Sequence, residues 1–255
     1  MGKAIAIFNQ KGGVGKTTTN INLAACLAIR GKKVLILDID PQGQTKLHTS
    51  GNGNLKDTIY NILVDKDYDP RKAIIKTSVN NLDLIPASVD LAGAEVELVS
   101  VDGRENALKE GLDKIKGGYD YVFIDCPPSL GLLTINSLAA VDSVLVPIQC
   151  EFYALEGVSQ LVSTIELVKK SLNPKLEIQG VILSMFDGRT NLSLQVVQEV
   201  KRYFGNKVYS TVIPRNVRLA EAPSYGMPIT EYDPKSKGAE AYGDFADEFL
   251  ELEED

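Results

Sequence analysis

The sequence predicts an α/β fold: a single domain built on a mostly parallel, doubly wound sheet with helices on both faces. Apolar, strand-like runs alternate along the chain with segments of helical periodicity. Most of these runs are apolar throughout, which is typical of strands buried on both sides. No Pro-, Gly- or Ser-rich spacer and no internal repeat interrupts the 255 residues. We therefore expect one domain over residues 1–255.

Seven segments rich in Val, Ile and Leu are predicted as strands: Ala4–Phe8, Lys33–Asp38, Leu82–Pro86, Tyr121–Asp125, Ser143–Pro147, Gln179–Ser184 and Lys207–Ile213. Six segments between or after them are predicted as helices: Lys16–Arg30, Ser88–Leu98, Arg104–Lys116, Ala154–Ser171, Leu192–Tyr203 and Ala239–Leu252. Asn52–Asp69 is polar and irregular, so we expect a surface excursion with a short helix near Leu55–Leu63. Because strand and helix alternate, parallel strands are expected.

Composition excludes several classes of protein. The 27 basic and 34 acidic residues give a net charge of −7, which argues against a surface coated in basic charge for nucleic acid. Apolar runs fall far short of the ~18–20 residues of a membrane span, and nothing resembles a signal peptide. Cys26, Cys126 and Cys150 show no CxxC spacing, and His48 is the one histidine. This pattern is typical of reduced thiols in a cytoplasmic protein and disfavours multi-histidine metal sites.

A glycine-rich loop follows the first predicted strand and opens the first predicted helix. It comprises Lys11, Gly12, Gly13, Val14, Gly15, Lys16, Thr17 and Thr18. This context is that of the phosphate-binding loop of P-loop NTPases, in which Lys16 would contact the β- and γ-phosphates and Thr17 would ligate Mg²⁺. The usual pattern has glycine six residues before the lysine, where this chain has Gln10 followed by a second lysine, Lys11.

Three carboxylates end predicted strands. Asp38 and Asp40 close the second strand and precede a Pro-Gln-Gly turn, and Asp125 ends the run Tyr121–Asp125. Ligands of doubly wound folds bind at the carboxyl ends of the strands. We therefore expect Asp125 to hold Mg²⁺ and Asp38 to support Mg²⁺ or the loop. Asp40 is either a catalytic group or a cap of the turn that follows it.

The segment Lys11–Thr18 resembles the deviant Walker A loop of the ParA/MinD family of P-loop ATPases. The resemblance covers essentially the whole chain and implies a slow, partner-stimulated ATPase with ATP and Mg²⁺ as cofactors. It implies a nucleotide-sandwich homodimer in which Lys11 reaches the partner's ATP, as an arginine finger would. It also implies that Asp40 positions the attacking water, and that Pro214 and Asn216 in the segment Val212–Asn216 contact adenine.

The chain is most similar to chromosomal ParA proteins of the Soj type. That resemblance implies nonspecific binding of double-stranded DNA by Arg189 and Arg218, release from DNA on hydrolysis, and stimulation by a ParB-type centromere-binding protein. From Val181 to Glu240 there are eight basic and six acidic residues, so charge alone gives this role little support. The expected location is the nucleoid.

Two alternatives stay open. A MinD-like ATPase would act at the membrane through a basic amphipathic tail, whereas this chain ends in the acidic segment Asp244–Asp255, which anionic lipid would repel. We therefore expect no membrane partner. A P-loop ligase or kinase for small molecules would need a dedicated acceptor pocket, for which the sequence has no recognisable motif.

Overall fold

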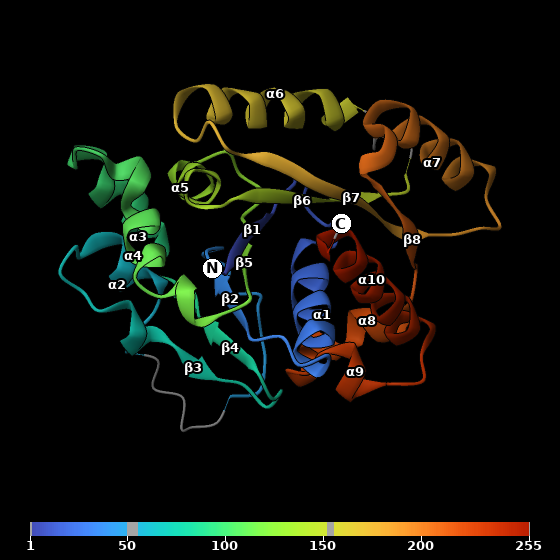
Figure 1. Ribbon diagram of the computed structural model, residues 1–255, viewed down its shortest axis with the longest axis horizontal. Coiled ribbons are helices and arrows are strands. Elements are labelled where there is room, and N and C mark those ends of the chain that lie inside the picture. Colours follow the sequence, from blue (N-terminus) through green and yellow to red (C-terminus); the bar gives the residue numbers. More distant parts are fainter. Residues whose placement is uncertain (1, 50–55, 152–155, 255) are drawn as a thin grey trace.

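The computed structural model describes residues 2–49, 56–151 and 156–254. One twisted sheet crosses the molecule, with helices on both sides of it (Figure 1). Within the described residues, eight strands are hydrogen-bonded in the order β3-β4-β2-β5-β1-β6-β7-β8. The strands are β1 (Lys3–Ile7), β2 (Val34–Asp38), β3 (Ile75–Lys76), β4 (Leu82–Ile85), β5 (Tyr121–Asp125), β6 (Ser143–Gln149), β7 (Glu177–Phe186) and β8 (Val208–Pro214).

All neighbouring strands are parallel except β3 and β4, so the predicted mostly parallel sheet is confirmed. The two-residue strand β3 was not predicted, because two residues are too few to carry a period-2 pattern. The central strand β1 lies between β5 and β6. The register pairs Asp125 at the end of β5 with Ile7 of β1 and with Asp38 of β2. The carboxyl ends of three central strands therefore meet at one edge.

Alternate residues of β1 enter two separate cores. Ala4 and Ala6 join a cluster that includes residues of α3–α7, whereas Ile5 and Ile7 join a cluster that includes α1 and α10. Figure 1 shows α6 and α7 on one side of the sheet and α1 and α10 on the other. Because both faces of the strands are covered, the continuous apolar runs of the sequence are explained.

The helices of the described residues are α1 (Lys16–Ile29), α2 (Ile59–Val64), α3 (Leu91–Glu97), α4 (Ala107–Asp113), α5 (Leu132–Ala140), α6 (Glu156–Ser171), α7 (Asn191–Phe204), α8 (Val217–Glu221), α9 (Ile229–Tyr232) and α10 (Lys237–Glu254). Each of the six helices predicted as separate segments corresponds to one of them, and α2 falls in the short helix predicted near Leu55–Leu63. The first residues of the predicted helix Ala154–Ser171, and Leu55 itself, lie outside the described residues.

Three helices were not predicted: α5, α8 and α9. Helix α5 contains Thr134, Asn136 and Ser137, which are poor helix formers. Packing compensates, since all three are buried. The Ser137 hydroxyl donates to the Leu133 carbonyl at 2.9 Å, and the Asn136 amide donates to the Leu132 carbonyl at 3.0 Å. Tertiary burial therefore overrides local preference here. None of the described helices has the length and apolar character needed to cross a lipid bilayer.

Candidate active site

The glycine loop joins β1 to α1 at the carboxyl edge of the sheet. Gly13 and Gly15 have φ of +75° and +88°, a left-handed conformation that other residues avoid. A methyl group added at Gly12 or Gly13 would meet no protein atom within 4 Å, so the loop leaves open space in front of its backbone. The N–H groups at the start of α1 add a partial positive charge. The loop thus has the shape and polarity of a phosphate site.

Two strand ends hold the loop in place. The Asn9 side chain accepts from the Lys11 amide at 3.0 Å and donates to the Pro147 carbonyl of β6 at 2.8 Å. The Ser184 hydroxyl of β7 donates to the Val14 carbonyl at 2.8 Å. The loop is therefore anchored before any ligand binds. Sequence reasoning missed both anchors, because Ser184 is 170 positions from Val14.

The two lysines of the loop have different surroundings. Lys16 is only 7% exposed, and its ammonium donates to the Lys11 carbonyl at 3.1 Å. Burial lowers the pKa of Lys16, and the Asp125 carboxylate opposes that shift. Lys11 is half-buried, and its ammonium makes no hydrogen bond or ion pair with the described residues. Its main chain is fixed at both the amide and the carbonyl, while its charge has no partner in the part of the chain that the structure describes.

Asp38 and Asp125 lie side by side at the ends of β2 and β5. The two oxygens of Asp38 accept from the amides of Asp40 at 3.0 Å and Thr45 at 2.9 Å. The Asp125 Oδ2 accepts from the Thr45 hydroxyl at 3.2 Å, and its Oδ1 is buried without a partner. Thr45 therefore links both carboxylates, a role that sequence reasoning missed because the residue belongs to no motif considered.

The electrostatics of this pair fit a bound cation. Burial raises the pKa of Asp125 to about 8, and the neighbouring Asp38 carboxylate adds to that shift. Burial likewise raises the pKa of Asp38 to about 6, and its backbone donors oppose the change. The Thr17 hydroxyl lies close enough to Asp125 to favour its charged form. The orphaned oxygen of Asp125 beside Thr17 is a suitable donor set for Mg²⁺, whereas both oxygens of Asp38 are occupied.

Asp40 lies just beyond β2 and is 9% exposed. Its Oδ1 accepts from the Gln42 amide at 3.0 Å and so caps the Pro-Gln-Gly turn. Its Oδ2 makes no hydrogen bond to the described residues. Asp40 can therefore cap the turn with Oδ1 and act on a ligand with Oδ2.

A pocket of about 350 Å³ adjoins the loop. It brings together Gly15 and Thr18 of the loop with Pro214, the last residue of β8, and Asn216, the residues that the family resemblance assigns to one nucleotide site. The Asn216 Oδ1 accepts from the Arg218 amide at 2.8 Å and caps α8, which leaves its Nδ2 as a donor. Met185 also lines the pocket and has a φ of +52°, a conformation rare for its type.

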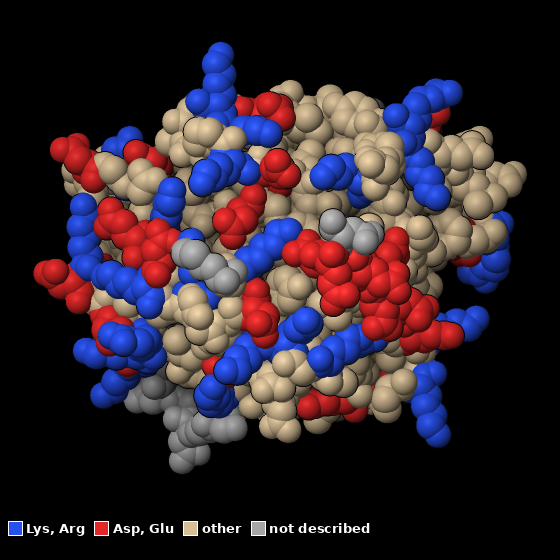
Figure 2. Space-filling model, viewed as in Figure 1, with Lys and Arg blue, Asp and Glu red and all other residues tan. Residues whose placement is uncertain are grey.

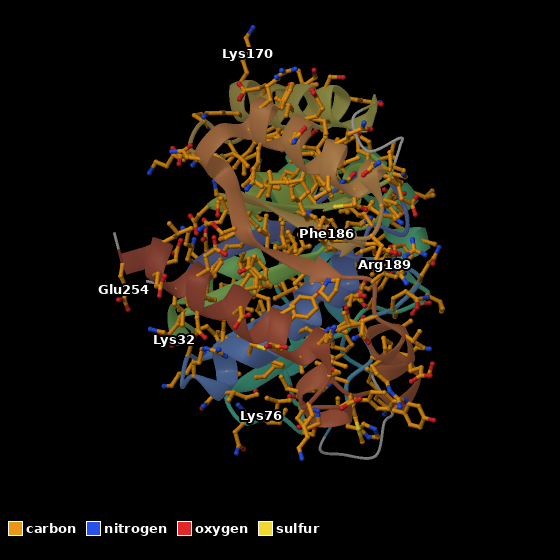
Figure 3. The ribbon with its side chains drawn as sticks, turned by 90° about the vertical axis from the view of Figure 1, so that its right-hand side faces the viewer. Lys32, Lys76, Lys170, Phe186, Arg189 and Glu254 are labelled. Carbon is orange, nitrogen blue, oxygen red and sulfur yellow. The ribbon has the colours of Figure 1, made fainter. Side chains whose placement is uncertain are left out.

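The two predicted DNA-contacting arginines are exposed: Arg189 follows β7, and Arg218 lies in α8 next to the pocket residue Asn216. The Arg189 side chain is 89% exposed and forms a two-point ion pair with Asp187, at 2.8 and 2.7 Å. This pairing lowers the pKa of Asp187 to about 2. Arg218 pairs with Glu221 at 2.9 Å and with Asp233 at 3.4 Å. Figure 3 shows Arg189 on the side of the molecule opposite to Lys32 and Glu254.

Comparison with known proteins gives relatives along almost the whole chain. A family model described as "AAA domain" matches residues 2–178. The chain is 61% identical over 252 residues to the sporulation initiation inhibitor protein Soj of Bacillus subtilis, covering 97% of this chain and 98% of that protein. It is 54% identical to the chromosome partitioning protein ParA of Myxococcus xanthus, covering 95% and 86%.

Solved structures share the fold. Cobyrinic acid a,c-diamide synthase from Mycobacterium smegmatis with bound ADP and magnesium is 40% identical, with a TM-score of 0.82 and coverage of 97% of this chain and 93% of that one. The septum site-determining protein MinD from Pyrococcus horikoshii, complexed with Mg-ADP, is 27% identical, with a TM-score of 0.79 and coverage of 99% and 97%.

The fold, the phosphate loop and these matches define a P-loop ATPase that uses ATP and Mg²⁺. Within that class the chain belongs to the ParA/MinD family, and its relatives of high identity are Soj-type ParA proteins. The family and the two cofactors expected from the sequence are thus confirmed.

Proposed function

We propose that the protein is a chromosome-partition ATPase that acts as a nucleotide-dependent switch on the bacterial nucleoid. The names of its Soj and ParA relatives support partition. The observation that carries the switch is Lys11, whose main chain is fixed at the edge of the phosphate loop and whose ammonium has no partner among the described residues. Such a charge is available to the phosphates bound by a second copy. One sheet includes strands from Lys3 to Pro214, so we propose that residues 1–255 form one ATPase domain.

Each residue of the site has a role in this scheme. The loop Gly12–Thr18 and the buried Lys16 bind the phosphates of the chain's own ATP, and Pro214 and Asn216 flank its base. Thr17 and Asp125 would hold Mg²⁺, with Asp38 supporting them through Thr45. Mg²⁺ bound there neutralises phosphate charge and fixes the phosphates for in-line attack. Asp40 uses its second oxygen to orient the attacking water.

Dimerisation creates the DNA-binding form. In one chain Arg189 and Arg218 are paired with carboxylates, so a single copy offers weak attraction for DNA. Two copies closed over ATP place four such arginines on one duplex, and each phosphate contact adds counterion release without reading sequence. Hydrolysis opens the dimer and releases the DNA. Turnover is slow until a ParB-type centromere-binding partner stimulates it.

The rival at the membrane has less support. The C-terminal helix α10 carries Asp244, Asp247, Glu248, Glu251, Glu253 and Glu254. These acidic residues form a red patch near the C-terminus in Figure 2. Anionic headgroups would repel this surface, whereas helices that bind membrane surfaces are usually basic on their polar face.

The likeness to cobyrinic acid a,c-diamide synthase favours a second candidate, an ATP-dependent amide-forming enzyme. Taking nitrogen from glutamine in such a reaction requires an activated thiolate. Burial raises the pKa of Cys126 to about 12 and those of Cys26 and Cys150 to about 11. None of the three thiols is therefore suited to attack glutamine at neutral pH. This candidate is tested by assaying amide formation from cobyrinic acid with glutamine or with ammonia.

The proposal is tested by measuring retention on random double-stranded DNA and on anionic liposomes with ATP, with ADP and without nucleotide. We expect salt-sensitive retention on DNA with ATP alone and no retention on liposomes. Arg189→Glu and Arg218→Glu should abolish DNA retention while ATP-dependent dimerisation remains. Nucleotide-independent DNA binding, or retention on liposomes with ATP, would overturn it.

A further inference from the structure

A second concave surface lies at the opposite edge of the sheet from the candidate active site. It is a pocket of about 480 Å³, which falls within the roughly 300–1,000 Å³ typical of ligand sites. Its walls come from the segments that precede β2, β4 and β5, from β3, and from the end of α4. The five residues of β2 separate the two edges by about 16 Å. The pocket is therefore distinct from the nucleotide site.

Cations dominate the lining. Lys33, Arg71, Lys76 and Lys114 line the pocket together with a single carboxylate, Asp83. Lys76 pairs with Asp83 at 2.7 Å, and Arg71 pairs with a carboxylate outside the lining at 2.9 Å. Lys33 and Lys114 form no ion pair with any described residue, and the Lys114 ammonium donates to the Lys66 carbonyl at 3.3 Å, which leaves its charge unneutralised. In Figure 2 basic side chains gather around the region of β3 and β4. A protein of net charge −7 thus concentrates positive charge in one hollow.

The floor of the pocket is organised by a buried group. Asp83 is 5% exposed and accepts from the Lys76 ammonium at 2.7 Å and from the Tyr119 hydroxyl at 2.8 Å. Burial and this carboxylate raise the pKa of Tyr119, so the phenol stays a donor. Asp83 therefore fixes the direction of one cation and of one aromatic ring. Tyr119 together with Ile74 and Ile115 gives the pocket an apolar wall.

We propose that this pocket binds a small phosphorylated organic compound, with its phosphate on Lys33 and Lys114 and its organic part against Tyr119. Unpaired cations supply the charge that a phosphate requires, and the ring supplies a surface for stacking or apolar contact. A small ligand fits better than duplex DNA, because the backbone phosphates of a rigid duplex cannot enter a concave pocket. The Asp83 carboxylate at the floor would also face such a backbone. Figure 3 also shows Lys76 well apart from Arg189, so the pocket does not extend the proposed DNA-binding arginines. The inference does not depend on the partition function.

The test is isothermal titration calorimetry on the full chain, with the phosphate loop saturated by a non-hydrolysable ATP analogue and Mg²⁺. The probes are inorganic pyrophosphate and AMP. The variant Lys33→Glu/Lys114→Glu reverses the two unpaired charges of the pocket. Lys170→Glu/Lys235→Glu is the matched control, since it makes the same change in net charge at exposed lysines outside the pocket. Circular dichroism and the unfolding midpoint check that the variants fold.

We expect wild-type protein to bind both probes and the pocket variant to bind them at least about tenfold more weakly, with the control unchanged. Tyr119→Ala should weaken AMP binding more than pyrophosphate binding. Equal affinity of the two charge-reversed variants would overturn the proposal, as would the absence of binding to wild-type protein. Loss of DNA retention in the pocket variant without any phosphate binding would also overturn it, and would assign the pocket to nucleic acid.

Discussion

Lys11 and Lys16 occupy one loop, and their different surroundings support the proposal that they serve different phosphates. The ammonium of Lys16 points inward and is held by the Lys11 carbonyl, close enough to Asp125 for their charges to interact. Lys11 has its amide and carbonyl fixed and its charge free of the described residues. A fixed main chain and a charge without a partner among the described residues support the proposal that Lys11 completes a site in a second copy.

Thr45 gives a prediction at this scale. Its hydroxyl donates to Asp125 and its main-chain amide donates to Asp38, so Thr45→Ala removes the donor to Asp125 and keeps the donor to Asp38. We expect Mg²⁺-dependent ATP affinity to fall about tenfold, the loss of a charge-assisted hydrogen bond, with little change in Mg²⁺-free ATP binding. Thr45→Ser should restore affinity, and Thr211→Ala, at a half-buried residue of β8, is the control. Fluorescent ATP titration with and without Mg²⁺ measures both, and an unaltered Mg²⁺ dependence in Thr45→Ala would refute the role.

The strand-end carboxylates predict a pH dependence. Burial raises the pKa of Asp125 to about 8 and of Asp38 to about 6, above the ~4 of an unfolded chain. Between about pH 4 and pH 8 the folded protein therefore binds more protons than the unfolded chain. The free energy of unfolding falls as the pH rises through this range. We expect metal- and nucleotide-free protein to unfold at a lower temperature at pH 8 than at pH 6. Asp125→Asn should flatten that dependence; an unchanged slope in this variant would contradict the assignment.

Residue types and spacing predicted the loop and the strand-end carboxylates, and the family resemblance implied the adenine-side segment. The structure brings the predicted residues Thr18, Pro214 and Asn216 to one pocket. Sequence spacing could not reveal the residues that anchor the phosphate loop. Asn9 and Ser184 act on the loop through main-chain contacts between distant strand ends, and such contacts exist only after the sheet forms.

At the scale of elements, α10 closes one face of the sheet against α1 and β8. Phe245 and Phe249 are fully buried, and the Phe249 ring meets that of Tyr121 edge-on at 5.4 Å between centroids. The amphipathic pattern of residues 239–252 predicted this helix. The short β3, α8 and α9 escaped prediction because they have two to five residues, too few for a period to emerge.

Phe249 allows the packing of α10 to be measured. Phe249→Ala should lower the free energy of unfolding by about 3–5 kcal/mol, because it removes a large buried side chain and leaves a cavity. Leu252 in the same helix is 53% exposed, so Leu252→Ala is the control and should be nearly neutral. Urea unfolding of both variants gives the comparison. Equal effects of the two substitutions would show that α10 does not pack as described.

At the scale of the whole molecule, the parallel sheet separates the candidate nucleotide site from the second pocket that we propose. The carboxyl edge gathers the phosphate loop, the carboxylates and the pocket beside Pro214 and Asn216, and the amino edge carries the basic pocket around Asp83. The acidic residues of α10 form a red patch near the C-terminus in Figure 2. Acidic and basic residues thus gather on different parts of the surface of a protein whose net charge is −7. The net charge therefore says little about individual sites.

The central claim is that Lys11 completes the ATP site of a second copy. Mixing two inactive variants tests it directly. Lys11→Ala keeps Asp40 but cannot serve its partner, and Asp40→Ala keeps Lys11 but cannot orient water in its own site. In a mixed dimer, the Lys11→Ala copy has its own Asp40 and receives Lys11 from the other, so one complete site forms.

The measurement is ATP turnover of each variant alone and of an equal mixture. Random pairing makes roughly half of the dimers mixed, each with one complete site of two, so the mixture should reach about a quarter of wild-type turnover per subunit. Each variant alone should be nearly inactive. A mixture no more active than the two variants measured separately, or wild-type turnover by Lys11→Ala alone, would contradict the account.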